Sequence, residues 1–160
     1  MFKPEEVEKE LSAFGKYVVK QARSRLTKGR HNDTKKLYNS IGFDLKVMRQ
    51  SFSMSFFMQD YGAYQDEGVR GAYSNKKAPN SPFRFKRNKP IGARPFEQWA
   101  KKRGISPFAV ARSVWTKGLK PTMFFTKPFE DAFLRLPEDV IEKFGLDVDE
   151  FLEQVTQGTD

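Results

Sequence analysis

The chain has 160 residues, of which 38% are hydrophobic, 31% charged and 14% aromatic. That length suits one domain with a real hydrophobic core, and the aromatic content argues against general disorder. Because there is no cysteine and one histidine, His31, the composition excludes a disulfide scaffold, a thiolate zinc site, an iron–sulfur cluster, a cysteine nucleophile and a multi-histidine metal site within one chain. No apolar run approaches the roughly 20 residues that cross a bilayer, and no apolar leader opens the sequence. We therefore expect a soluble protein that folds in a reducing cytoplasm.

The net charge of +9 is unevenly placed along the chain. Residues 70–120 hold fourteen Lys and Arg and one acid, Glu97, which is a local charge of +13. Residues 138–160 hold eight acids and one lysine, Lys143, which is a local charge of −7. A basic middle and an acidic end can attract polyanions, and they can also let copies of the chain dock head to tail. Charge alone leaves both interpretations open.

The first predicted element is one long amphipathic helix over residues 4–28. Its apolar residues recur three or four positions apart and so form one stripe. Pro4 suits the first helical turn, where its missing N–H costs nothing, and Gly29 is a plausible stop. A polar break at 29–33 follows, and then a short segment over 34–41.

The next predicted element is a β-hairpin over residues 42–58. Apolar and polar residues alternate in 43–47 and again in 52–56, and this period of two indicates strands with one wet face. A later extended segment near 120–126 is expected to add another strand to this small antiparallel sheet.

Between the hairpin and that strand, residues 70–94 read as a long loop rich in Gly, Pro, Lys and Arg, a length usually associated with function or disorder. Short helices are expected at 95–103 and 107–117, the second capped by Ser106 and followed by Gly118. Three further short helices are expected, beginning after Pro128, after Pro137 and after Asp147.

These elements predict an α+β fold in which the N-terminal helix packs on the small sheet and several short helices follow. The predicted organisation is one α+β domain over 1–136 with a basic insertion at about 70–118. An acidic helical extension covers 137–160.

Little in the sequence supports catalysis. A Ser–His–acid triad needs a positioned base, and His31 lies in a charged break where a solvated histidine is expected. Asp60, Asp66 and Glu67 could bind magnesium in a nuclease, but they equally fit a solvated turn. No phosphate-binding or dinucleotide-binding glycine motif is present. We therefore predict no enzyme, no catalytic residues, no metal and no cofactor.

The basic segment carries the better signal for binding. Its cations are interleaved with Tyr73, Phe83 and Phe85, and such a mixture can meet phosphates and stack on bases. The alternatives are a solvated loop or a loop that docks on an acidic protein. The candidate contacts with DNA, with the lumen of a ring or with a partner are Lys76, Lys77, Arg84, Lys86, Arg87, Lys89 and Arg94.

Three further segments follow one another in a recognisable order. The first is Leu37-Tyr38-Asn39-Ser40-Ile41, ahead of the hairpin. The second is Tyr61-Gly62-Ala63-Tyr64-Gln65-Asp66-Glu67-Gly68, read as the end of a strand. The third is Met123-Phe124-Phe125-Thr126-Lys127-Pro128-Phe129, which enters a late helix. In this order the chain resembles, over about 5–136, the tail-completion or neck proteins of tailed bacteriophages, the family of minor tail protein Z of lambda-like phages.

That resemblance implies a non-enzymatic virion protein of the phage neck, which joins tail to head as a subunit of a closed ring of six. It implies synthesis in the host cytoplasm, contacts with other neck, connector and tail proteins, non-specific contact with genomic DNA, and no membrane. The expected subunit-interface residues are Tyr61, Tyr64, Glu67, Trp115, Phe124, Phe125 and Phe129. The alternative from another class is a small basic nucleic-acid-binding protein that works alone.

Overall fold

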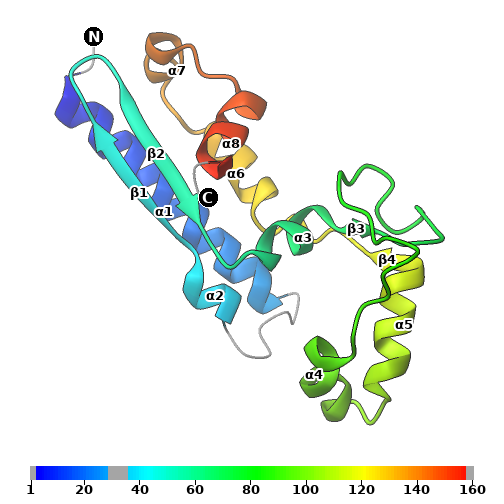
Figure 1. The fold of residues 1–160 in the computed structure, drawn as a ribbon. Coiled ribbons are helices and arrows are strands. Elements are labelled where there is room, and N and C mark those ends of the chain that lie inside the picture. The colour runs from blue at the N-terminus through cyan, green and yellow to red at the C-terminus, as the bar shows by residue number, and fades with distance from the viewer. Residues whose placement is uncertain (1–2, 29–35, 158–160) are drawn as a thin grey trace. The chain divides into compact units, whose positions relative to one another are not determined.

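The computed structural model describes residues 3–28 and 36–157 (Figure 1). The chain divides into two compact units, which we call unit 1 (Met1–Gln59 with Phe124–Asp160) and unit 2 (Asp60–Met123). The polar break predicted at 29–33, with His31, lies outside the described residues. Within the described ranges, no helix is long and apolar enough to cross a membrane.

Unit 1 confirms the α+β class, with the long N-terminal helix against the hairpin and short helices after it (Figure 1). The hairpin is antiparallel and pairs Gly42 with Phe57 at its open end. Its elements are α1 (Pro4–Lys28), α2 (Lys36–Ser40), β1 (Gly42–Val47), β2 (Phe52–Phe57), α6 (Thr126–Phe133), α7 (Glu138–Phe144) and α8 (Val148–Gln157).

Phenylalanine rings fill the core of unit 1. The ring of Phe14 on α1 meets Phe129 of α6 edge-on, with 5.1 Å between centroids, and stacks on Phe151 of α8 at 5.6 Å. Phe56 of β2 meets Phe125 edge-on at 5.2 Å. Such pairs each contribute about 0.5–1.5 kcal/mol beyond the burial of their area. The cluster therefore joins the helix, the hairpin and the later helices.

The acidic C-terminal helices share this core. Val140 of α7 and Val155 of α8 are buried with the phenylalanine cluster. Asp147 caps α8 as predicted, because its Oδ1 accepts hydrogen bonds from the backbone N–H groups of Asp149 and Glu150 at 3.1 and 3.2 Å. The acids of α7 and α8 are thus carried on the outside of helices whose apolar side chains are buried.

Unit 2 places a short two-stranded sheet between helices. Its elements are α3 (Tyr61–Glu67), β3 (Val69–Arg70), a 3₁₀ turn at Arg94–Phe96, α4 (Glu97–Lys102), α5 (Pro107–Lys117) and β4 (Gly118–Leu119). The predicted cap of α5 is present, since the Ser106 hydroxyl accepts from the Ala109 N–H at 3.5 Å.

Two expectations for this region need correction. Residues 61–67 form the helix α3, not the end of a strand (Figure 1). The spacing of Tyr61 and Tyr64 is one helical turn, and no alternation of apolar and polar residues opposes it. The later strand lies at 118–119, ahead of the expected 120–126, and it pairs with β3 in a separate sheet instead of joining the hairpin.

Close approach of two glycines makes the pairing of β3 with β4 possible. A Cβ added at Gly71 would lie 2.5 Å from the carbonyl carbon of Lys117 and 2.7 Å from the backbone nitrogen of Gly118. Gly118 itself has a φ of +93°, which side-chain-bearing residues rarely adopt, and its added Cβ would lie 2.6 Å from the nitrogen of Gly71. The atoms that each added Cβ would meet belong to the backbone, so they cannot rotate away.

We expect Gly71→Ala to destabilise unit 2 by about 1–3 kcal/mol, the usual cost of inserting a group into a packed site. The matched control is Gly92→Ala, where an added Cβ meets nothing within 4 Å. Trp99 and Trp115, the two tryptophans of the chain, both lie in unit 2, so denaturation followed by tryptophan fluorescence reports on this unit. Equal midpoints for the two variants would contradict the close approach.

Candidate functional site

The charge of the protein is concentrated in unit 2. Residues 60–123 carry fourteen Lys and Arg against four Asp and Glu, a net charge of +10. The rest of the chain carries fifteen Lys and Arg against sixteen Asp and Glu, a net charge of −1. The two compact units therefore differ strongly in charge, and the basic surface belongs to the smaller one.

The loop between β3 and α4 is fastened to β3 by backbone hydrogen bonds. The N–H of Arg70 donates to the carbonyl of Phe83 at 2.9 Å, and the N–H of Phe85 donates to the carbonyl of Arg70 at 3.0 Å. The buried hydroxyl of Ser81 donates to the carbonyl of Gly68 at 2.6 Å. These bonds hold 81–85 beside β3 as a short parallel bridge.

A second set of contacts fastens the same loop to α5. The indole Nε1–H of Trp115 donates to the carbonyl of Lys86 at 2.9 Å. The guanidinium of Arg87 donates from Nε to the carbonyl of Ala72 at 3.0 Å and lies 5.1 Å from the centre of the Tyr73 ring. Tyr73 in turn meets Trp115 edge-on at 5.5 Å. The basic loop is thus held at two places within unit 2.

All seven predicted contact residues of this loop have exposed side chains. The structure gives two of them a second role, because Arg87 holds the loop and Arg84 donates to the side-chain oxygen of Asn75. The four lysines, Lys76, Lys77, Lys86 and Lys89, present ammonium groups from a fastened backbone. We call these four the lysine set. They form the part of the basic segment best suited to meet phosphates or carboxylates.

Three predicted interface residues lie on α3, beside the loop. Tyr61 and Tyr64 are 39% and 44% exposed, and the Tyr64 ring meets Phe83 edge-on at 4.6 Å. Part of Glu67 is exposed, but partial desolvation of its carboxyl group and the neighbouring charge of Asp66 raise its pKa above the ordinary value. Helix α3 therefore offers two aromatic rings at the surface of unit 2.

The other predicted interface residues are placed differently. Phe124, Phe125 and Phe129 are at most 2% exposed and lie in the core of unit 1, where they offer no surface to a partner. Their aromatic run serves packing, since Phe125 contacts Phe56 of the hairpin and Phe129 contacts Phe14 of α1. Trp115 is half-buried, and the hydrogen bond from its indole to Lys86 holds the basic loop against α5.

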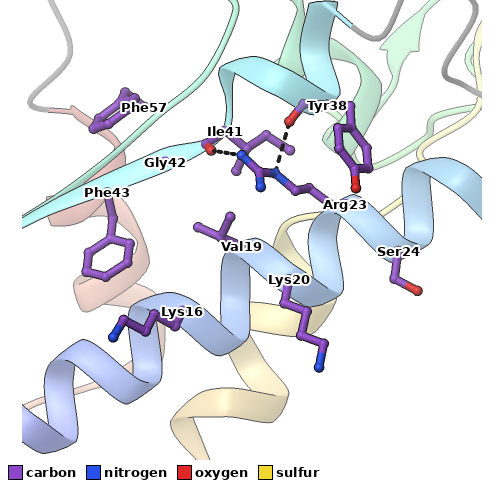
Figure 2. Close-up of a pocket in the computed structure, with 10 residues that line it drawn as sticks. All are labelled: Lys16, Val19, Lys20, Arg23, Ser24, Tyr38, Ile41, Gly42, Phe43 and Phe57. Carbon is purple, nitrogen blue, oxygen red and sulfur yellow. Dashed lines mark hydrogen bonds between the residues drawn. The ribbon is translucent and has the colours of Figure 1, made fainter.

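Unit 1 carries a groove of about 610 Å³ that the sequence did not reveal (Figure 2). One wall is a stretch of α1 with Lys16, Val19, Lys20 and Arg23. The facing wall includes the aromatic rings of Phe43 and Phe57, from the two strands of the hairpin. Because positions 16, 20 and 23 lie on one face of a helix, three cations line the same groove as the apolar side chains of Val19, Phe43 and Phe57.

Arg23 fixes the shape of this groove. Its Nε donates to the carbonyl of Tyr38 and its Nη2 to the carbonyl of Ile41, both at 3.1 Å (Figure 2). The guanidinium also lies 5.3 Å from the centre of the Tyr38 ring. At Gly42, an added Cβ would lie 2.5 Å from the ring of Phe57, so that ring rests directly on the backbone. The groove is therefore built by contacts between α1, α2 and the hairpin.

The acids considered for a metal site lie at the start of unit 2. Asp66 is buried, whereas Asp60 and Glu67 are exposed. Among residues 3–28 and 36–157, no three acidic or histidine side chains come together in a group that could hold a metal ion.

Comparisons of the chain with protein-family models, with curated proteins and with solved structures find no match. The resemblance to phage tail-completion proteins therefore stays a prediction.

We expect Trp115→Phe to loosen the basic loop without removing its ring contact with Tyr73. Removing one indole hydrogen bond costs about 0.5–1.5 kcal/mol, or up to about tenfold in an opening equilibrium. Hydrogen exchange should therefore quicken by about that factor at two loop amides, those of Phe85, which donates to the carbonyl of Arg70 in β3, and Lys89, which donates to the carbonyl of Lys86.

The matched control for this measurement is Trp99→Phe. Trp99 lies on α4, where the guanidinium of Arg103, one turn further along the chain, lies 4.1 Å from the centre of its ring. Unchanged exchange in the Trp115 variant would show that the indole does not fasten the loop.

Proposed function

We propose that the chain is a non-enzymatic structural subunit of a bacteriophage neck, which joins tail to head as a member of a closed ring of six. The observation that carries this proposal is the separation of charge between two compact units, +10 in one and −1 in the other. A ring subunit needs unlike surfaces for its two neighbours, because a head-to-tail contact joins two different patches. The order of the three sequence segments that resemble tail-completion proteins supports the same proposal.

The acidic C-terminal helices give unit 1 a surface that the lysine set can meet. Glu142 on α7 and Asp149, Glu150 and Glu153 on α8 are exposed. Opposite charges on neighbouring subunits steer assembly and disfavour wrong partners. In such a ring, the ammonium groups of the lysine set would also contact the phosphates of DNA that passes through it, and this contact does not depend on the base sequence.

The proposal is tested by the absolute copy number of the chain in purified particles of the phage that encodes it. Quantitative mass spectrometry, with the major capsid and portal proteins as internal standards, should give a small fixed number, about six or twelve, as cyclic symmetry requires. Absence of the chain from mature particles would overturn a structural role in the neck.

A second candidate function is binding of nucleic acid by the chain on its own. The observation that favours it is the fastened lysine set beside Tyr73, a residue that is 57% exposed and of the aromatic type that stacks on bases. The two functions require different affinities for DNA. A protein that works alone must bind DNA at physiological salt, whereas a ring subunit need only contact it.

We expect weak binding to double-stranded DNA that disappears at physiological salt. Fluorescence anisotropy at several salt concentrations measures it, and replacing all four residues of the lysine set by Gln should lower the salt slope by about one for each phosphate that is no longer neutralised. The control replaces four exposed lysines of unit 1, Lys3, Lys9, Lys28 and Lys46, by Gln. Tight, saturating binding at physiological salt would favour the second function.

A further inference from the structure

The groove of unit 1 carries a positive charge that no acid among its lining residues balances. Those ten residues include three cations and no Asp or Glu. All four acids of α1 lie at or before Glu10, whereas residues 11–28 hold five Lys and Arg and no acid. On the facing strand β1, Asp44 and Lys46 share one face and offset each other. The charge of the groove therefore favours an anionic ligand.

Two of the three cations are available to such a ligand. Arg23 already donates to the carbonyls of Tyr38 and Ile41. Lys16 and Lys20 are exposed, and neither ammonium group has a hydrogen bond or an ion pair with another residue of 3–28 or 36–157. They lie four positions apart, which is about 6 Å along the helix axis. Acids four positions apart on a helix, or two apart on a strand, have a similar spacing.

The groove also leaves apolar surface uncovered. Phe57 is 41% exposed, and Val19 and Phe43, which line the same groove, are half-buried. Figure 2 shows Val19 pointing from α1 toward the hairpin. The volume of about 610 Å³ lies within the range of roughly 300–1,000 Å³ that is usual for ligand-binding clefts. A small anion would leave these side chains in contact with water, whereas a ligand that also carries an apolar group would cover them.

We infer that the groove binds an acidic peptide segment of a partner protein, in which two carboxylates flank a large apolar side chain. The carboxylates meet the ammonium groups of Lys16 and Lys20, and the apolar side chain covers Phe43 and Phe57. Exposed ion pairs contribute little affinity by themselves, so the apolar contact supplies most of the affinity and the charges supply selectivity. The groove belongs to unit 1 alone, and this inference does not require the proposed ring.

Nucleic acid fits the groove less well than such a peptide does. A DNA duplex presents phosphates at its surface and keeps its bases stacked inside, so it would meet the two lysines and leave Phe43 and Phe57 uncovered. A single strand can stack a base on an exposed ring such as that of Phe57. Single-stranded DNA is therefore the competing ligand in the test.

Selection from a yeast-displayed library of random 12-residue peptides tests the inference on the full chain. Peptides are selected on the wild type and counter-selected on Lys16→Glu/Lys20→Glu, which reverses the charge of the groove. The enriched peptides should share two acids around a large apolar residue. The best of them, labelled with fluorescein, should bind the wild type with a Kd of about 1–100 µM by fluorescence anisotropy, and bind the double variant at least tenfold more weakly.

The matched control, Arg25→Glu/Lys28→Glu, makes the same charge change at exposed cations of α1 that do not line the groove. It should bind within about threefold of the wild type at 0.15 M salt, where the Debye length is about 8 Å. Phe57→Ala should also lose at least tenfold, whereas Phe108→Ala, at a 76% exposed residue of unit 2, should lose nothing. Circular dichroism checks the fold of each variant, and the charge-reversal pair decides the outcome if Phe57→Ala unfolds.

Three results would overturn the inference: a selection that enriches no peptide, enriched peptides that bind the charge-reversed groove as tightly as the wild type, or a labelled twelve-residue oligothymidylate that binds the groove more tightly than they do. The copy number in particles is a separate measurement. A small fixed copy number without peptide binding would leave the proposed function standing and remove this site. Specific peptide binding by a chain that is absent from particles would do the reverse.

Discussion

The backbone approach of Gly71 to Gly118 is the constraint on which unit 2 depends. It lets β3 and β4 lie side by side, although 47 positions separate these glycines and each strand has only two residues. Two-residue strands offer few hydrogen bonds, so close packing and the contacts around the crossing must hold the pair. The basic loop is then fastened to both sides of this crossing, to β3 by Phe83 and to the end of α5 by Trp115.

Sequence periodicity predicted the elements that have enough turns or residues to show a period. Helix α1, both strands of the hairpin and α5 with its Ser106 cap occur where the pattern placed them. Two short elements were predicted wrongly, because α3 spans two turns and β4 two residues, and neither length establishes a period. The pairing of β3 with β4 could not be predicted for a further reason: it requires knowing which distant glycines meet.

The sequence predicted the positive charge of the candidate site but not the contacts that hold it in place. The lysine set stood out as a basic run, whereas the hydrogen bond from Trp115 to Lys86 joins residues 29 positions apart. On α1, Lys16, Lys20 and Arg23 matched the solvated face of an amphipathic helix, and only the position of the hairpin turns that face into the wall of a groove. The spacing of these three residues, four positions and then three, was the available sequence signal for the groove. Every exposed helix face shows the same spacing.

A basic loop that is already held in place loses less conformational entropy on binding a partner than a flexible loop does. Ordering a residue costs roughly 1–2 kcal/mol of conformational entropy, and a loop already held by Trp115, Arg87 and the bridge to β3 has met that cost within the folded chain. Its lysines then meet a partner from fixed positions, so little further ordering opposes binding. Fixed charges also define a geometry, and a geometry favours one arrangement of neighbouring subunits over others. If the chain repeats a single contact around a ring, as we propose, that preorganisation matters more than the total charge.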